Sequence, residues 1–323
     1  MNPRPTEEQI TALVERAGTL FISAATIARC ISYDNFQANP HDRLENVLNA
    51  SSGTKKHKDI DELYTDVLQG ALDNPDLEDI EIEDRKQVLY TVICAKEPLT
   101  VDTLSKLLKM KRVDRVHAAL RPLWSVLHVS STSDLVTTFH ASFPDYMLDP
   151  LRSKQYHCDP QMHNRTLALA CFDCFRNMRP QFNICGLESS FIPHREVPGL
   201  QQRVKEVIKT ETIYAARYWG VHLRSARPSP DLLLAVEEVL SVRLLLWMEV
   251  MNLKYKGHFM LEAIQPVEEG ATEYLENLQA LVYDALAFVR ISGFRGTVPQ
   301  HTSHLYVRAS LLAPVESNCQ VLC

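Results

Sequence analysis

Hydrophobic residues recur at helical spacing along most of the chain. Between residues 7 and 32 they predict two helices separated by a break at Gly18, and a shorter helix covers 41–48. A polar, basic linker follows at 51–58, and the next apolar stripe, at 63–68, predicts another helix. The first part of the chain is therefore expected to be helical.

The next stretch, from about residue 83 to 150, shows helical spacing first and then the alternation typical of strands. Three helical segments come first: one stops at Pro98, the second can take its N-cap from Thr100, and the third from Asp114. Two strand-like runs follow, at 126–129 and 135–139, with a polar turn between them. Three helices followed by a β-hairpin are the outline of a winged-helix domain.

Helical spacing returns where Asp159 and Pro160 form a typical helix start. Further helices are expected at 200–208, at 213–223, from Ser229 through Leu240 with a bend or break near Ser241, at 244–251, and at 272–290. Trp219 and Trp247 lie within these apolar patterns, so both are expected in a core. The chain is irregular after Ser292.

These patterns predict a mainly α-helical protein in four parts. They are a helical piece with a linker (1–58), a winged-helix domain of three helices plus a β-hairpin (59–152), a helical domain (153–290) and an irregular tail (291–323). The winged helix is thus expected to be flanked by helical domains.

Composition narrows the class of protein. Hydrophobic residues make up 46% of the 323 residues and charged residues 23%, which is typical of a globular protein. The net charge of −6 disfavours a general binder of polyanions. Eight cysteines without regular spacing predict reduced thiols and a cytoplasmic location. The longest apolar run, 244–251, is too short to cross a bilayer, so no membrane partner is expected.

The chain has no nucleotide-gripping loop. The closest glycine-lysine run, at 53–56, lacks the second glycine that lets backbone N–H groups wrap a phosphate. No buried-looking strand ends in an acidic residue placed to hold magnesium. We therefore expect no enzymatic activity and assign no catalytic residues.

Several stretches together match one family. Three of them are VLYTVICAKEPLT (88–100), AALRPLWSVL (118–127) and FHASFPDYM (139–147). They resemble the winged-helix segment of fungal NACHT-type STAND proteins, which are NTPases that often carry WD repeats. Residues 20–25 resemble the small helical domain that closes the nucleotide pocket of these proteins, and 182–185, 218–219 and 246–250 resemble their later helical region. The resemblance covers roughly residues 10–310.

The resemblance implies a regulatory role in signal transduction. In that family a P-loop module binds ATP or ADP, and the winged helix folds over the nucleotide to hold an off state. Exchange or hydrolysis then releases this lid and allows oligomerisation. The chain resembles the region C-terminal to the P-loop module, and residues 304–307 resemble the lead-in to a WD-repeat propeller. We therefore expect a truncated member of the family that acts as a lid and relay. It should bind no nucleotide alone, and it should contact ATP or ADP only when a NACHT nucleotide-binding domain is its partner.

One residue is implied as a binding residue. His140 matches the winged-helix histidine that contacts the β-phosphate of ADP in NACHT proteins. An imidazole N–H can donate to a phosphate oxygen, and a nearby anion favours the protonated ring. The alternative is that His140 ends a strand and bonds a backbone carbonyl.

A zinc site is a second candidate. Cys171 and Cys174 have the CxxC spacing, and His157, Cys158 and His163 are near in sequence. The pair lies inside an apolar helical pattern, where cysteine behaves as a small hydrophobe. We therefore expect core packing and no metal.

Nucleic-acid binding is the alternative function. The segment 106–121 is basic, with Lys106, Lys109, Lys111, Arg112, Arg115 and Arg121. The predicted hairpin, however, carries no Lys or Arg between Arg121 and Arg152 that could hold phosphates. This favours a solvated face or an acidic protein partner over nucleic acid.

Overall fold

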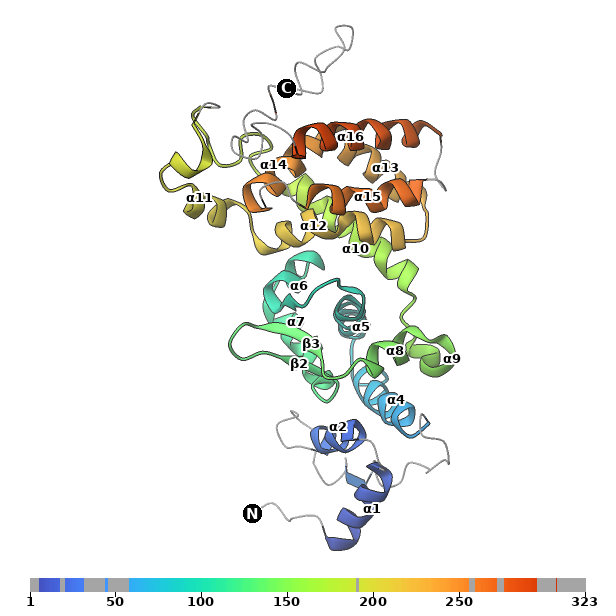
Figure 1. Ribbon diagram of the computed structural model, residues 1–323. Helices are drawn as coiled ribbons and strands as arrows, with labels where there is room; N and C mark the ends of the chain where they lie inside the picture. The colour runs from blue at the N-terminus through green and yellow to red at the C-terminus, as the bar shows by residue number, and fades with distance from the viewer. Residues whose placement is uncertain are drawn as a thin grey trace. The chain divides into compact units, whose positions relative to one another are not determined.

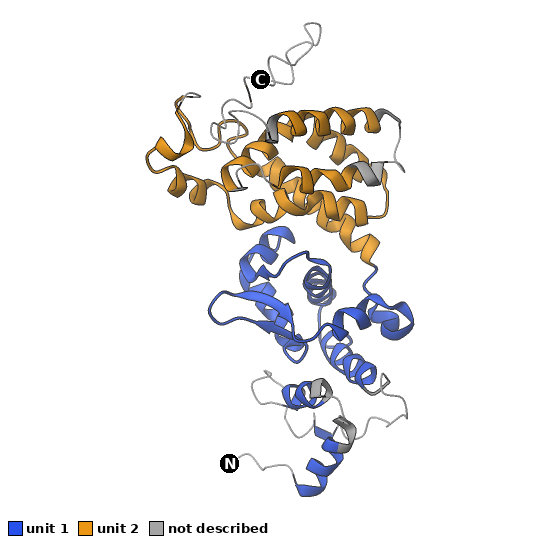
Figure 2. Ribbon diagram, in the orientation of Figure 1, with its two compact units in different colours: residues 1–159 blue, residues 160–323 orange. Residues whose placement is uncertain are grey.

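The computed structural model describes residues 6–17, 21–31, 44–45, 58–189, 192–255, 259–271, 276–294 and 306. The chain forms two compact units, Met1–Asp159 and Pro160–Cys323 (Figure 2). The described residues are mainly helical, and a small three-stranded sheet belongs to the first unit (Figure 1). The expected mainly α-helical class is confirmed, while the finer division at 58, 152 and 290 stays a prediction.

The first unit begins with helices α1, α2 and α4. Their bounds are α1 (Glu7–Ala17), α2 (Phe21–Ile31) and α4 (Lys58–Leu72). The two helices predicted between 7 and 32 are present, while Gly18 lies outside the described residues. The predicted 41–48 helix is described only at Leu44 and Glu45, both helical. The predicted linker lies outside the described residues apart from Lys58, which already belongs to α4.

The second part of this unit carries the sheet. The elements are α5 (Asp79–Cys94), β1 (Leu99–Thr100), α6 (Val101–Leu107), α7 (Val113–Leu120), η1 (Arg121–Leu123), β2 (Leu127–Val129), β3 (Leu135–Thr138), α8 (Ser142–Leu148), α9 (Pro150–Ser153) and η2 (Lys154–Tyr156). The three helices and both hairpin strands that the sequence predicts are therefore present. Strand β3 is central in the order β1-β3-β2, and both of its pairings are antiparallel.

The helix ends test the predicted caps. Thr100 caps α6, because its Oγ1 accepts the backbone N–H of Thr103 at 3.1 Å. The prediction that Asp114 caps α7 is wrong, since the N-cap position is held by Arg112. Asp114 lies instead in the first turn, where a negative charge favours the helix N-terminus, and its carboxylate binds Arg112 at 2.6 Å.

One apolar core joins α5, α6, α7 and the hairpin. Its members are all buried: Val88, Leu89, Leu104, Val116, Leu120, Leu123 and Val136. These are the positions with helical or alternating spacing, so burial of this stripe accounts for the elements that the pattern predicts.

The regular elements of the second unit are all helical within its described residues. The elements are α10 (Pro160–Asn177), η3 (His194–Glu196), α11 (Leu200–Val207), α12 (Thr210–Ser225), α13 (Pro230–Glu238), η4 (Val239–Arg243), α14 (Leu244–Tyr255), α15 (Met260–Ala271) and α16 (Glu276–Phe294). A bend or break was expected near Ser241, and the chain does not break there. The chain instead passes from α13 into α14 through η4, a π-helical turn. Helix α15 was not predicted.

The core of the second unit is built around two tryptophans. The rings of Trp219 and Trp247 meet edge to face at 5.9 Å, and Phe172 packs against Trp219 at 5.7 Å. The indole N–H of Trp247 donates to the carbonyl of Ala216 at 2.8 Å. Both tryptophans are fully buried, as the sequence predicts.

Candidate functional site

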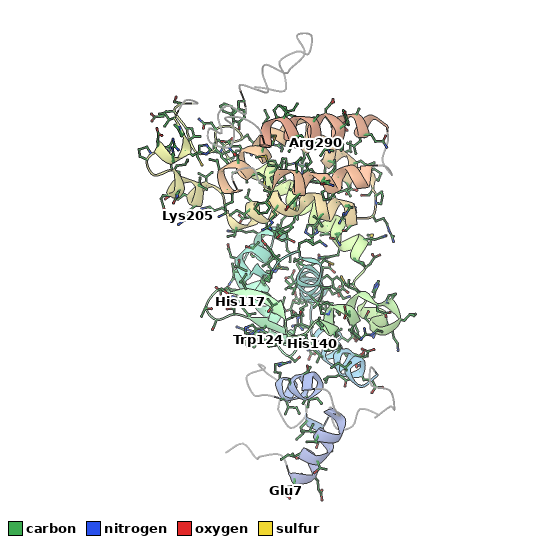
Figure 3. The ribbon with its side chains drawn as sticks, viewed as in Figure 1. Glu7, His117, Trp124, His140, Lys205 and Arg290 are labelled. Atoms are coloured by element: carbon green, nitrogen blue, oxygen red, sulfur yellow. The ribbon has the colours of Figure 1, made fainter. Side chains whose placement is uncertain are left out.

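His140 lies in the short connection between β3 and α8 (labelled in Figure 3). Its side chain is exposed, and the residue comes directly after Phe139, where the hairpin ends. The adjoining α8 begins two residues later, at Ser142. The position is therefore set by two elements of regular structure, while the ring itself faces solvent.

Ser142 holds the ring of His140. The backbone N–H of Ser142 donates to Nδ1 at 3.1 Å, and the Ser142 hydroxyl oxygen lies 2.8 Å from the same nitrogen. A backbone N–H can only donate, so Nδ1 is the acceptor and Nε2 carries the proton of the neutral ring. The recorded bonds of the ring thus go to Ser142 and not to a backbone carbonyl.

Ser142 is held in turn by Tyr64 of α4. The Tyr64 hydroxyl lies 2.8 Å from the Ser142 hydroxyl oxygen. Because Nδ1 of His140 accepts, the Ser142 hydroxyl donates to it and accepts from Tyr64. Tyr64 is buried, and this burial raises the pKa of its hydroxyl, which keeps it protonated as a donor. A chain of hydrogen bonds therefore runs from the core to His140.

The helix that carries Tyr64 is fixed against α8 and α9. Arg152 binds the carboxylate of Asp61 through two bonds, of 3.0 and 2.6 Å. The hydroxyls of Thr65 and Tyr146 lie 2.8 Å apart. These contacts make α4, α8 and α9 one support for the hydrogen-bond chain.

A cation lies beside the same connection. The guanidinium carbon of Arg29, on α2, lies 3.8 Å from the ring centroid of Phe139, the residue before His140. Arg29 also donates from Nε to the carbonyl of Ser125 at 3.2 Å. Sequence reasoning missed Arg29 as a site residue. A signal existed, because it is the one charged residue of the apolar helix α2.

The basic segment 106–121 is partly neutralised by aspartates. Arg115 binds Asp84 at 2.5 Å, in a partly buried pair. Lys106 binds Asp102 at 2.8 Å, and Arg112 binds Asp114. At least three of the six basic residues are therefore paired with carboxylates, which lowers the positive charge that this face offers to a phosphate backbone.

The CxxC pair lies within α10. Cys171 is completely buried, and this burial raises the pKa of its thiol well above the usual value, so the thiolate that zinc requires is disfavoured. Burial also lowers the pKa of His163 to about 4. His157 bonds the carbonyl of Leu148 at 3.3 Å, and both residues belong to the first unit, whereas Cys171 belongs to the second. The expected core packing is confirmed for Cys171.

No group of three or more His, Cys, Asp or Glu side chains that could hold a metal ion occurs within the described residues. The glycine-lysine run at 53–56 lies outside them. None of the described helices is at once long and apolar enough to pass through a membrane.

Comparison with known proteins gives no relative. No protein-family model, no curated protein and no solved structure matches the chain.

Proposed function

We propose that residues of the first unit form a winged helix that serves as the lid and relay of a NACHT-type signalling switch in the cytoplasm. The order of elements supports this: α5, β1, α6, α7 and the β2-β3 hairpin, with β3 between β1 and β2. Three helices and one hairpin in this order are what a winged helix requires, which supports the proposal. The P-loop and the magnesium site would then belong to a partner NACHT nucleotide-binding domain, and the chain would not hydrolyse nucleotide by itself.

The observation that carries the proposal is the hydrogen bond from the Ser142 backbone N–H to Nδ1 of His140. With Nδ1 occupied by the N–H of Ser142, the Nε2–H of an exposed ring is left to donate outward. A fixed imidazole donor suits a phosphate oxygen of ADP, and the Arg29 guanidinium, packed on the ring of the preceding residue Phe139, adds positive charge to the same connection. Because the ring is already oriented by Ser142 and Tyr64, it loses little freedom when an anion binds.

The test is binding to a NACHT nucleotide-binding domain supplied in trans. Calorimetry would compare the affinity of the chain for that domain loaded with ADP and with ATP. We expect tighter binding to the ADP form and a loss of roughly tenfold in His140→Ala, the loss typical of one charge-assisted hydrogen bond. His117→Ala, a histidine on α7 (Figure 3), is the matched control and should bind as the wild type does.

Three results would count against the proposal. They are the absence of binding to any ADP-loaded NACHT domain, equal binding by the His140→Ala variant, and magnesium-dependent ATP turnover by the chain alone. A gel shift with duplex DNA tests the alternative function. Salt-sensitive binding that disappears when Lys109, Arg112 and Arg115 are neutralised would favour a nucleic-acid-binding winged helix instead.

A further inference from the structure

Two thiols far apart in sequence meet in the first unit. Cys94 is the last residue of α5, and Cys158 follows η2 by two residues. Their sulfurs lie 3.7 Å apart, and the two residues are only 6% and 0% exposed. Both are free cysteines. The backbone N–H of Cys158 donates to the carbonyl of Met147 at 2.9 Å, which fixes one side of the pair.

The two thiols differ in acidity. The hydrogen bond from Cys158 lowers the pKa of Cys94 despite its burial, and the charge of Lys96 acts in the same direction. The same hydrogen bond raises the pKa of Cys158, and burial raises it further. Because Lys96 favours the thiolate of Cys94, we assign Cys94 as the attacking thiol of the pair and Cys158 as its partner.

We propose that Cys94 and Cys158 are a redox site that closes to a reversible disulfide when a hydroperoxide is present. Bond formation requires the sulfurs to approach from 3.7 Å to about 2.05 Å. The inference depends on the thiol pair alone and holds whether or not His140 contacts a phosphate.

The reaction has two steps. The Cys94 thiolate attacks a peroxide oxygen, the O–O bond breaks, and Cys94 becomes a sulfenic acid while hydroxide leaves and takes up a proton as water. The Cys158 sulfur then attacks the Cys94 sulfur, the S–S bond forms and the S–O bond breaks. The departing hydroxide takes the Cys158 proton as a second water. Two thiols are oxidised and one hydrogen peroxide is reduced.

The bond would enclose much of the first unit in a covalent loop. Residues 95–157 lie between the two cysteines, and they include β1, β2, β3 and His140. Closing a loop of this length removes conformations from the unfolded chain, so the oxidised first unit should melt roughly 5–10 °C higher. The hairpin and the histidine beside it would be held together more firmly in the oxidised protein.

Peptide mapping of the full chain tests the site. Folded protein would be treated with a small excess of hydrogen peroxide, its remaining thiols blocked with N-ethylmaleimide, and the trypsin digest analysed without reduction. Cleavage after Lys86, Lys96, Lys154 and Arg165 releases peptides 87–96 and 155–165. We expect these two to be the main linked pair, and we expect dithiothreitol to abolish both the link and the rise in melting temperature.

Variants make the result specific. Cys171→Ser, in the buried CxxC of α10, should leave the 94–158 link intact. Cys158→Ser should remove it and leave the Cys94 sulfenic acid open to capture by dimedone. If this variant does not fold, the wild type is used instead, and linkage of the two peptides in folded protein is compared with linkage after unfolding in urea. Linkage only after unfolding in urea, or consumption of Cys94 by peroxide without a linked peptide, overturns the inference.

Discussion

Ser142 donates its backbone N–H to Nδ1 of His140 at 3.1 Å. The donor is part of the first turn of α8, so the orientation of the ring is tied to the folding of that helix. The hydroxyl of the same serine connects the ring to Tyr64 in the core. The tautomer of the exposed His140 ring is thus set by hydrogen bonds that lead through Ser142 to the buried Tyr64.

The tautomer can be measured directly. We expect the ¹⁵N shifts of the neutral His140 ring to show a proton on Nε2 and none on Nδ1, because Nδ1 accepts from Ser142. Ser142→Ala keeps the backbone donor but removes the hydroxyl, so the preference should weaken without reversing. The same change removes the oxygen that accepts from Tyr64 and should cost about 1 kcal/mol of stability. A ring protonated mainly on Nδ1 would contradict the assigned role of Ser142.

Two glycines should respond to alanine in opposite ways. A Cβ on Gly220 of α12 would lie 2.1 Å from the backbone carbonyl oxygen of Ala263 on α15, so the helices would have to separate. We expect Gly220→Ala to lower the free energy of unfolding by roughly 3 kcal/mol. A Cβ on Gly70 of α4 would meet nothing within 4 Å. Gly70→Ala should therefore raise the free energy of unfolding by roughly 0.5–1 kcal/mol, because alanine favours a helix more than glycine does.

Urea denaturation measures both glycine variants. Circular dichroism of the whole chain follows Gly70→Ala, which lies in the first unit, and tryptophan fluorescence follows Gly220→Ala, which lies in the second. Trp124 is in the first unit, while Trp219 and Trp247 are in the second. A Trp124→Phe background therefore lets urea unfolding of the second unit be followed by tryptophan fluorescence. A Gly220→Ala variant as stable as its parent would show that the approach of α12 to α15 is not this close.

A buried polar chain stabilises the second unit. His222 receives the Tyr214 hydroxyl at Nε2 (2.8 Å) and donates from Nδ1 to the side-chain oxygen of Asn164 (2.7 Å). All three side chains are buried. We expect Tyr214→Phe to cost roughly 1–3 kcal/mol, because it removes a buried donor from the ring. Tyr283→Phe, on an exposed tyrosine of α16, should change little in the same urea titration.

The buried carboxyl of Glu249 should make stability depend on pH. It accepts the N–H of Ile184 at 2.8 Å and the hydroxyl of Tyr306, and burial raises its pKa from 4.5 to about 6. The folded state therefore holds the proton more tightly than the unfolded state. The resulting stability is fully present below pH 4.5 and is lost as the pH rises through 6, by about 2 kcal/mol in all.

The comparison with Glu249→Gln isolates this contribution. Glutamine stays neutral, so its advantage over the wild type should grow by about 2 kcal/mol between pH 4.5 and 7.5. Glu262→Gln, on an exposed residue of α15, provides the control. Urea titrations at the two pH values give the numbers, and parallel pH responses of wild type and Glu249→Gln would refute the assignment.

The sequence alone predicts those elements whose hydrophobic pattern is local. The apolar stripes of α5, α6 and α7 and the paired runs of the hairpin show the periods of their elements. Strand β1 was missed because it has two residues and exists only through its pairing with β3. Helix α15 was missed because Pro266, in its interior, normally ends a helix.

The site was predictable to a smaller degree. His140 was found through a resemblance, whereas Tyr64 and Arg29 come from elements more than 70 residues away and carry no spacing signal. The same is true of Cys94 and Cys158, which are 64 residues apart. Such contacts result from tertiary packing, and periodicity in one sequence contains no information about them.

The π-helical turn η4 should allow the long helix from α13 to α14 to lose one residue at 239–243 without disrupting its packing. From Pro230 to Tyr255 the chain winds continuously, and only at 239–243 does it take up an additional residue. Deleting one residue there should let the backbone relax to the regular pitch with both flanking segments still facing as before. The same deletion a turn later, within α14, would rotate the following residues by about 100° and turn Met251 away from its neighbours.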